Sequence, residues 1–301
     1  MLERRRLGRT EHRSTVAVLG GAAFWAATPE EARAGFGLAM DRGINHLDIA
    51  PQYGAAESVV GPLVPAVRDR LFVAGKTLRA NPDGVRAQFD DTRRLLGCEV
   101  LDLYQAHGVV SIEELDRRSA GIEAIVGLRD TGGTHFAGIT GHDHGVPAAF
   151  LVALERFDLD TVMFPVNAYL WGDDAYRETA EELLAVCAAR DVGVMAIKAA
   201  ARRPWSDGRP LADRVEGDDA TADRWADTWY EPQPAGDALA AGVRFTLSTP
   251  GVTALCTPGD RGLLPAVLDA CEAVSSMDDD ERAAAVVHAR ADGAEIFPIP
   301  R

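Results

Sequence analysis

Two lysines stand out in this 301-residue chain, because the rest of its 31 Lys and Arg residues are arginines. Lys76 ends the apolar run LFVAGK, which predicts a buried strand. The strand expected from INHLDI reaches Asp48, with Tyr53 close behind it, and the strand expected from LDLYQAH ends at His107. An ammonium group can be titrated and can tune a neighbouring phenol, whereas a guanidinium stays charged. These four side chains are therefore our candidate catalytic residues.

Together the four groups have the chemistry to protonate an oxygen on which negative charge develops. We expect Lys76 to lower the pKa of the Tyr53 phenol, and Asp48 to keep that lysine charged and in place. A neutral His107 would donate a hydrogen bond to a substrate carbonyl oxygen. None of these residue types supplies a hydride, so a reduction needs a cofactor. Taken singly, each residue also has a purely structural interpretation, as a loop cap, a surface aromatic ring, a solvated strand end or a rim histidine.

The segments that would position these residues are short apolar runs that alternate with longer amphipathic stretches. The runs that predict strands are VAVLG (around 17–20), INHLDI (44–49), LFVAG (71–75), LDLYQ (101–105), HFAGI (135–139), TVMFP (161–165), VGVMAI (192–197) and VTALC (252–256). The stretches that predict helices start near Pro29 and cover 82–96, 111–129, 146–155, 174–190, 236–246, 263–274 and 278–291. This alternation predicts an α/β fold, a (β/α)8 TIM barrel whose strand ends meet at one rim.

We predict a single domain over residues 1–301. A doubly wound sheet would carry a glycine fingerprint after its first strand, and no GxGxxG follows Gly20 and Gly21. The longest break, about residues 200–235, is a long loop after strand seven. Because it holds Trp205, Trp225, Trp229 and Tyr230, we interpret it as a flap on the active-site rim.

Composition excludes several classes of partner. The net charge of −15 argues against nucleic acid and against an anionic membrane surface. No run approaches the ~20 apolar residues of a membrane span, and the charged opening MLERRRLGRT does not resemble a signal peptide, so we expect a cytoplasmic protein. The spacing of the four cysteines suits no metal site, so we expect none. The acidity fits either simple solubility or a high-salt cytoplasm.

Three segments carry a resemblance to a known family. GINHLDIAPQYGAAESVVG resembles the aldo-keto reductase signature, and FVAGKT and DLYQAHG resemble that family's third-strand lysine and fourth-strand histidine segments. The opening RRLGRTEHRSTVAVLGG resembles its N-terminal β-hairpin, which closes the barrel floor. The resemblance, which runs from about Arg5 to Ala273, implies a monomer or weak homo-oligomer that binds NADP(H), with NAD(H) as second choice. It implies reduction of an aldehyde or ketone to an alcohol by hydride transfer, with Tyr53 as proton donor.

The resemblance also implies cofactor-binding residues, some of which depart from the family pattern. The run Thr140-Gly141-His142 stands where the family usually has Ser-Asn, so His142 would replace the missing amide. Lys198 stands where an aromatic residue often stacks on the nicotinamide, and both features resemble a divergent branch. The usual Gln of strand six falls at Met163, for which Asn167 would compensate. The expected cofactor-binding set is Gly21, Thr140, His142, Asn167, Lys198, Thr257, Gly259 and Arg261, with Arg261 on the 2′-phosphate.

Three aromatic residues, Phe24, Trp25 and Trp171, follow predicted strands, and we expect them to line the substrate mouth, with core packing as the alternative. They favour a small apolar or aromatic carbonyl compound. Two other functions stay open. One is a non-catalytic NADPH-sensing subunit, motivated by the altered carboxamide-binding positions. The other is a Schiff-base lyase that uses Lys198.

Overall fold

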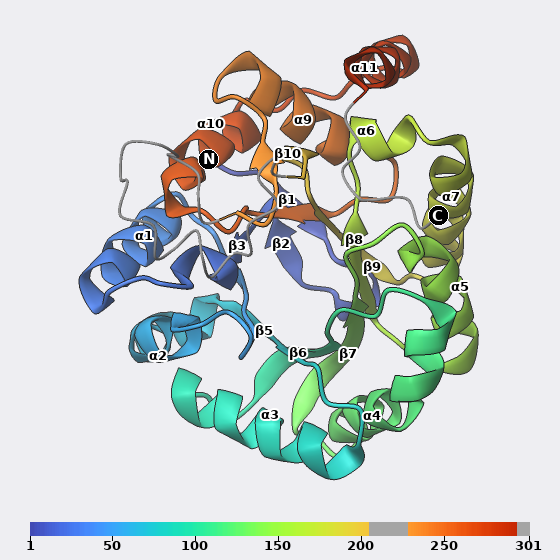
Figure 1. The fold of residues 1–301 in the computed structure, drawn as a ribbon. Coiled ribbons are helices and arrows are strands. Elements are labelled where there is room, and N and C mark those ends of the chain that lie inside the picture. The colour runs from blue at the N-terminus through green and yellow to red at the C-terminus, as the bar shows by residue number, and fades with distance from the viewer. Residues whose placement is uncertain (205–227, 294–301) are drawn as a thin grey trace.

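The structure is a computed structural model that describes residues 1–204 and 228–293. In this part of the chain, parallel strands close into a barrel in the order β12-β3-β4-β5-β6-β7-β8-β9 (Figure 1). All eight strands predicted from the apolar runs are in it, so the TIM-barrel prediction is confirmed. The barrel strands are β3 (Ala17–Gly20), β4 (His46–Asp48), β5 (Phe72–Thr77), β6 (Leu101–Ala106), β7 (Thr134–Thr140), β8 (Thr161–Pro165), β9 (Gly193–Ile197) and β12 (Ala254–Cys256).

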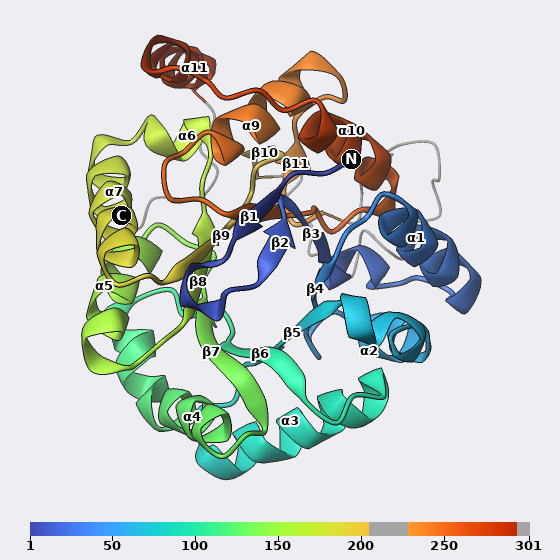
Figure 2. The same cartoon turned by 180° about the vertical axis from the view of Figure 1, so that it is seen from behind.

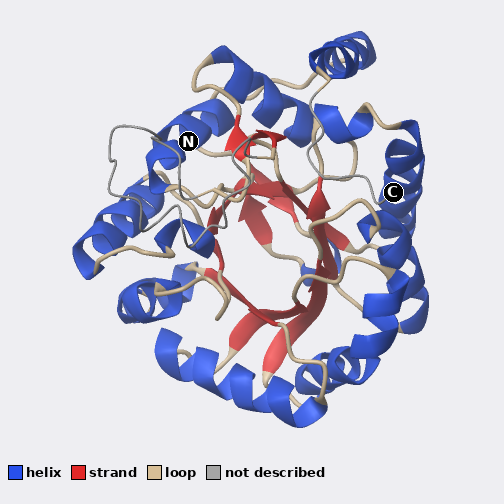
Figure 3. Ribbon diagram, in the orientation of Figure 1, coloured by secondary structure: helices blue, strands red, loops and turns tan. Residues whose placement is uncertain are grey.

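Helices surround the barrel on its outer side (Figure 3). Their ends follow local capping signals: Thr28 and Glu31 form a capping box at the start of α1, and Gly97, with φ of 62°, ends α3 in the left-handed region. The short α2 and α6 were not predicted, because they are too short to show a periodic pattern. The α-helices in the described residues are α1 (Pro29–Asp41), α2 (Ala56–Val60), α3 (Pro82–Leu96), α4 (Ile112–Asp130), α5 (Val146–Arg156), α6 (Ala168–Trp171), α7 (Asp174–Ala189), α9 (Asp237–Leu247), α10 (Leu264–Glu272) and α11 (Asp279–Asp292).

The amino-terminal hairpin lies across one end of the barrel (Figure 2). Its strands β1 (Arg4–Arg6) and β2 (Arg13–Thr15) pair antiparallel. Leu7, between them, is fully buried and packs with inward-facing barrel residues such as Met163 and Met195. Gly8 adopts φ of 48°, and a Cβ there would lie only 2.3 Å from the backbone nitrogen of Gly193. The hairpin therefore closes the barrel floor, as the resemblance implied.

The long connection after β9 begins and ends in a small ribbon. Strand β10 (Ala201–Arg203) pairs antiparallel with β11 (Glu231–Pro232), which holds the two ends of the connection together. Trp205 and Trp225 lie outside the described residues, so the flap stays a prediction. None of the helices in residues 1–204 and 228–293 is long and apolar enough to cross a membrane.

Candidate active site

A cavity of about 580 Å³ opens where the barrel strands end. This is the rim at which side chains from separate strands of a TIM barrel converge. The buried Lys76 lies directly behind its wall, with 1% of its surface exposed. The predicted residues that line the cavity are Trp25, Asp48, Tyr53, His107, His142, Lys198, Thr257 and Gly259.

Lys76 connects the carboxylate and the phenol. Its Nζ donates to Oδ2 of Asp48 and lies 2.9 Å from the phenol oxygen of Tyr53. The parallel register brings this about, because β4 and β5 are neighbours and successive inward positions on a strand are two residues apart. Nε2 of Gln105, which pairs with Lys76 in the barrel, donates to Oδ1 of Asp48 at 3.1 Å. Both carboxylate oxygens are thus hydrogen-bonded, and the ion pair is fixed from two sides.

The pKa of Tyr53 differs from our expectation. Burial is the largest influence, and it raises the pKa of the phenol to about 12. Lys76 acts in the expected, lowering direction, but Asp48 opposes it. The pKa of Lys76 itself is raised by Asp48 and Tyr53, which outweigh the lowering effect of burial. Tyr53 is therefore a protonated donor at neutral pH, held beside a permanent cation.

His107 and His142 contact each other in the cavity wall, with their Nε2 atoms 3.4 Å apart. Nδ1 of His107 lies 3.1 Å from Oε1 of Gln52, and because this oxygen only accepts, Nδ1 carries the proton. Burial lowers the pKa of His107 well below its usual value and that of His142 to about 3, with nearby lysines adding to both effects. Both rings are neutral at neutral pH, and one N–H lies between their Nε2 atoms.

Lys198 lies just past β9 in an unusual backbone conformation. Its φ is 70°, in the left-handed region that a side chain rarely adopts. Its carbonyl oxygen accepts hydrogen bonds from Nδ2 of Asn167 and from the backbone of Ala201, both at 3.0 Å. The ammonium lies 4.4 Å from the centre of the Tyr230 ring, and burial lowers its pKa to about 8.

Asn167 does not reach the cavity, although we expected it to bind the cofactor. It is buried, and its side chain both caps α6 and holds Lys198 in place. Two further members of the predicted set lie behind the wall. Thr140 is buried, with Gly108 donating to its hydroxyl, and a Cβ on Gly21 would lie 2.7 Å from Ile49. These three residues therefore shape the site from behind.

The segment after β12 forms the outer rim of the cavity. The hydroxyl of Thr257 accepts a hydrogen bond from the backbone N–H of Gly20 at 2.9 Å. This bond joins the last and first barrel strands beyond the end of their backbone pairing. Arg261 lies outside the lining, with its guanidinium 2.8 Å from the carboxylate of Glu31. Asp260 caps the short helix η5 (Arg261–Leu263) by accepting from Gly262. The predicted phosphate ligand is thus already engaged with an acidic partner.

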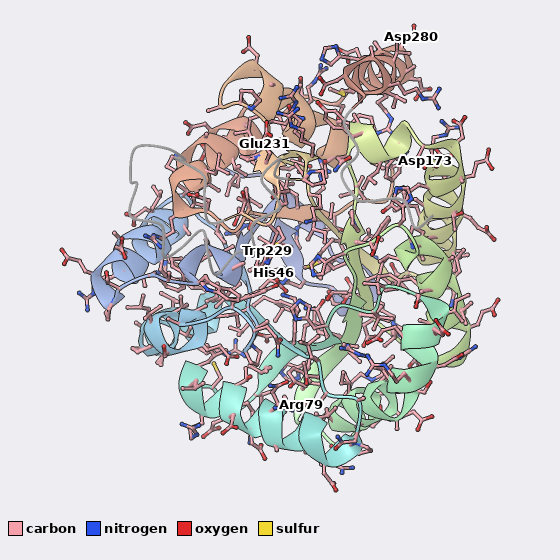
Figure 4. All side chains as sticks on the ribbon, viewed as in Figure 1. His46, Arg79, Asp173, Trp229, Glu231 and Asp280 are labelled. Atoms are coloured by element: carbon pink, nitrogen blue, oxygen red, sulfur yellow. The ribbon has the colours of Figure 1, made fainter. Side chains whose placement is uncertain are left out.

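The aromatic residues divide between core and cavity. Our expectation was wrong for Phe24 and Trp171, which are fully buried away from the cavity, in keeping with the core-packing alternative. Trp25 does line the cavity, and its ring centroid lies 6.0 Å from that of Trp229. Trp229 is 46% exposed and projects over the barrel centre, near Tyr53 (Figure 4).

Sequence reasoning missed three polar residues of the site. Gln105 holds Asp48, Gln52 holds His107, and the thiol of Cys256 lies 3.7 Å from Oδ2 of Asp48. Strand periodicity is the signal that would have found Gln105, because it precedes His107 by two positions and so points to the same face. No comparable signal marks Gln52 or Cys256.

The arrangement can donate a proton and orient an oxygen. A protonated phenol, a fixed ammonium group and an imidazole N–H all belong to one partly apolar cavity. Such preorganised groups stabilise negative charge on an oxygen more strongly than water does. None of them accepts or delivers a hydride, which leaves that part to a cofactor.

Comparisons with known proteins show the family of the chain. The model of the Aldo/keto reductase family matches residues 17–231. The D/L-glyceraldehyde reductase of Hypocrea jecorina is 33% identical over 96 residues, and aldo-keto reductase family 1 member A1 of Cricetulus griseus is 31% identical over 105 residues. These matches span 29% and 32% of both this chain and the respective relative.

Solved structures extend the similarity of fold to nearly the whole chain. The holo form of aldo-keto reductase AKR11C1 from Bacillus halodurans aligns with a TM-score of 0.70 at 19% identity, covering 96% of both chains. Its apo form aligns with a TM-score of 0.66 and the same coverage and identity. At this level of identity the alignments establish the fold alone.

Proposed function

We propose, from the premise that this chain belongs to the aldo/keto reductase family, that it reduces an aldehyde or ketone to an alcohol with NADP(H) as hydride donor. The observation that carries this proposal is the position of the Lys76 ammonium, which contacts both Asp48 and the Tyr53 phenol at the cavity wall. Burying an ion pair costs free energy, and apolar side chains of similar size would pack at least as well. The buried lysine between an acid and a phenol is therefore better explained by chemistry than by packing.

The residues present fit a nicotinamide cofactor. The cavity of about 580 Å³ has room for a planar ring and a small carbonyl compound, and the aromatic rings of Trp25, Trp229 and Tyr230 line it. When bound, the reduced nicotinamide would supply a hydride to the carbonyl carbon. Thr257 and Gly259 would hold the cofactor at the rim, and Arg261 would turn from Glu31 to the 2′-phosphate, which favours NADP(H) over NAD(H).

The chain's own residues handle the oxygen and its proton. Tyr53 keeps its proton at neutral pH, since its pKa is about 12, and gives it to the oxygen as negative charge develops there. The phenolate that results is stabilised by the ammonium of Lys76 at 2.9 Å. Because Nδ1 of His107 carries its proton, the N–H between the two rings belongs to Nε2 of His142, and it would turn from His107 to orient the same oxygen. Asp48 keeps the lysine in position throughout.

The replacement Tyr53→Phe tests this proposal. We expect turnover of a test aldehyde with NADPH to fall by at least about 10²-fold, because a positioned proton donor contributes this much or more. Quenching of tryptophan fluorescence by NADPH should be unchanged. The matched control is Tyr169→Phe, on α6 outside this cavity, which should keep full activity. Undiminished turnover in Tyr53→Phe would remove the proposed donor.

Cofactor binding, turnover and covalent trapping separate the two other functions. Tight NADPH binding by the unmodified protein without turnover on any aldehyde would support a cofactor-sensing subunit. A Schiff-base lyase depends on Lys198, whose pKa of about 8 leaves part of it as free amine. Trapping of a carbonyl compound on Lys198 with borohydride would support the lyase.

A further inference from the structure

Both lysines of this chain converge on one cavity. Lys198 lines it, and Lys76 lies directly behind its wall. The carboxylate of Asp48 is hydrogen-bonded to Lys76, and it is the one acidic group among the described residues that line the cavity. Since Asp48 offsets Lys76, the second ammonium gives the described lining a net positive charge, although the whole chain carries −15.

The position of this second ammonium is built into the backbone. Lys198 has φ of 70°, and such a conformation persists only where the surroundings impose it. Two hydrogen bonds hold this conformation: the side chain of Asn167 and the backbone N–H of Ala201 both donate to the Lys198 carbonyl oxygen. The Tyr230 ring then lies 4.4 Å from Nζ, in a cation–π contact. The charge is therefore held at the cavity rather than extended into solvent.

A fixed positive charge distinguishes the two oxidation states of a nicotinamide. The oxidised ring is a cation and the reduced ring is neutral, while the rest of the cofactor is the same. A cavity of 580 Å³ is roughly 10 Å across, and two unit charges about 12 Å apart at an effective dielectric constant of about 20 change a dissociation constant by about tenfold. The effect depends on the separation only gradually, so it does not require a particular pose.

We propose that Lys198 makes this cavity discriminate against the oxidised nicotinamide, so that the site holds the reduced cofactor and releases the oxidised one. The inference rests on the proposed function, in that a nicotinamide must bind in this cavity. It adds a cofactor preference to that function, because the site would bind the reduced cofactor more tightly and would release the oxidised one after hydride transfer.

Other charged groups around Lys198 do not remove its charge at neutral pH. Burial lowers its pKa to about 8, and Asp143 acts in the opposite direction. His142, which feels the charge of Lys198, is neutral, as is His107. Tyr53 keeps its proton well above pH 8. Lys198 therefore loses its charge as the pH rises through about 8, and the discrimination should be lost with it.

The test is a pair of dissociation constants, for NADP⁺ and for NADPH, measured by tryptophan fluorescence quenching at pH 6.5 and 9.5. In the unmodified protein we expect the ratio of the NADP⁺ constant to the NADPH constant to fall about tenfold between these pH values. Lys198→Met should show the lower ratio at both. Lys198→Arg should keep the higher ratio at both, because a guanidinium stays charged at pH 9.5.

Each remaining outcome counts against the proposal. Equal ratios in the unmodified protein and in Lys198→Met overturn it. Equal weakening of both cofactor forms also overturns it, because it assigns Lys198 to a phosphate or ribose that the two forms share. If the unmodified protein binds neither NADP⁺ nor NADPH, the proposed function fails as well. If it binds both forms but Lys198→Met does not change their ratio, only the role of Lys198 fails. Circular dichroism and the retained behaviour of Lys198→Arg show whether a loss comes from misfolding.

Discussion

The two ends of the barrel bury polar side chains in different surroundings. At the mouth, Asp48 and Lys76 are ionised, hydrogen-bonded to each other and placed against a cavity. At the floor, His12 stacks on Phe72 with ring centroids 4.3 Å apart, and His46 shares a hydrogen bond with Ser14. Burial lowers the pKa of His12 to about 4 and that of His46 well below its usual value, so both rings are neutral. The buried carboxylate of Asp160 at this end forms ion pairs with Arg9 and Arg129 on the outer side of the barrel, away from any cavity of the mouth.

The difference lies in what the buried charges face, because only the ion pair at the mouth is placed against the cavity. A buried ion pair seldom adds stability over apolar packing, so the mouth retains one for its chemistry. The floor instead uses ring stacking and the buried Leu7 to close the barrel. Trp229 and His46 appear near one another in the view along the barrel, but they belong to these opposite ends (Figure 4). We therefore expect mutations at the mouth to abolish activity and mutations at the floor to reduce stability alone.

The largest effect should come from breaking the ion pair. Lys76→Met leaves the Asp48 carboxylate buried without a cation, which costs about 3–5 kcal/mol of unfolding free energy. The double variant Asp48→Asn with Lys76→Met has no buried charge at this site, so it should regain most of that stability. Turnover should stay lost in both. Urea unfolding and an NADPH oxidation assay check this, and recovery of turnover in the double variant would contradict the assigned chemistry.

A slightly smaller loss of unfolding free energy is expected from a mutation at the floor. Leu7→Ala removes a fully buried side chain between the hairpin and the barrel interior, which costs about 2–5 kcal/mol. Turnover measured well below the melting temperature should be nearly unchanged. The control is Leu78→Ala at an exposed position, which should change stability by less than about 0.5 kcal/mol. A large loss of turnover in Leu7→Ala would show that the two ends are coupled.

The smallest effect concerns the outer rim, where Glu31 competes for Arg261. The carboxylate is 2.8 Å from the guanidinium and both are partly exposed, so the pair is worth at most about 1 kcal/mol. Glu31→Gln should tighten NADPH binding by up to about fivefold and leave NADH binding unchanged. Glu30→Gln, in the same exposed turn, is the matched control. Equal tightening for both cofactors would argue against Arg261 as the 2′-phosphate ligand.

Most of the architecture could be predicted from the sequence, because strands and helices are local patterns. The eight barrel strands and the long helices agree with their predicted ranges to within a few residues. The four central residues were found because each lies at or just past the end of a strand. The pKa of Tyr53 could not be predicted, since it depends on burial, Lys76 and Asp48 together. The predicted lowering of the Tyr53 pKa was therefore wrong.

The sequence by itself determined the barrel and the rim at which Asp48, Lys76 and His107 meet, because strand order and a two-residue period place them there. Only the tertiary structure decided the direction of side chains in the loops. Phe24 and Trp25 are neighbours, yet the first is in the core and the second lines the cavity. Asn167 likewise turns to Lys198 instead of the cavity. Loop residues follow no period, so contacts with distant segments set where each of them points.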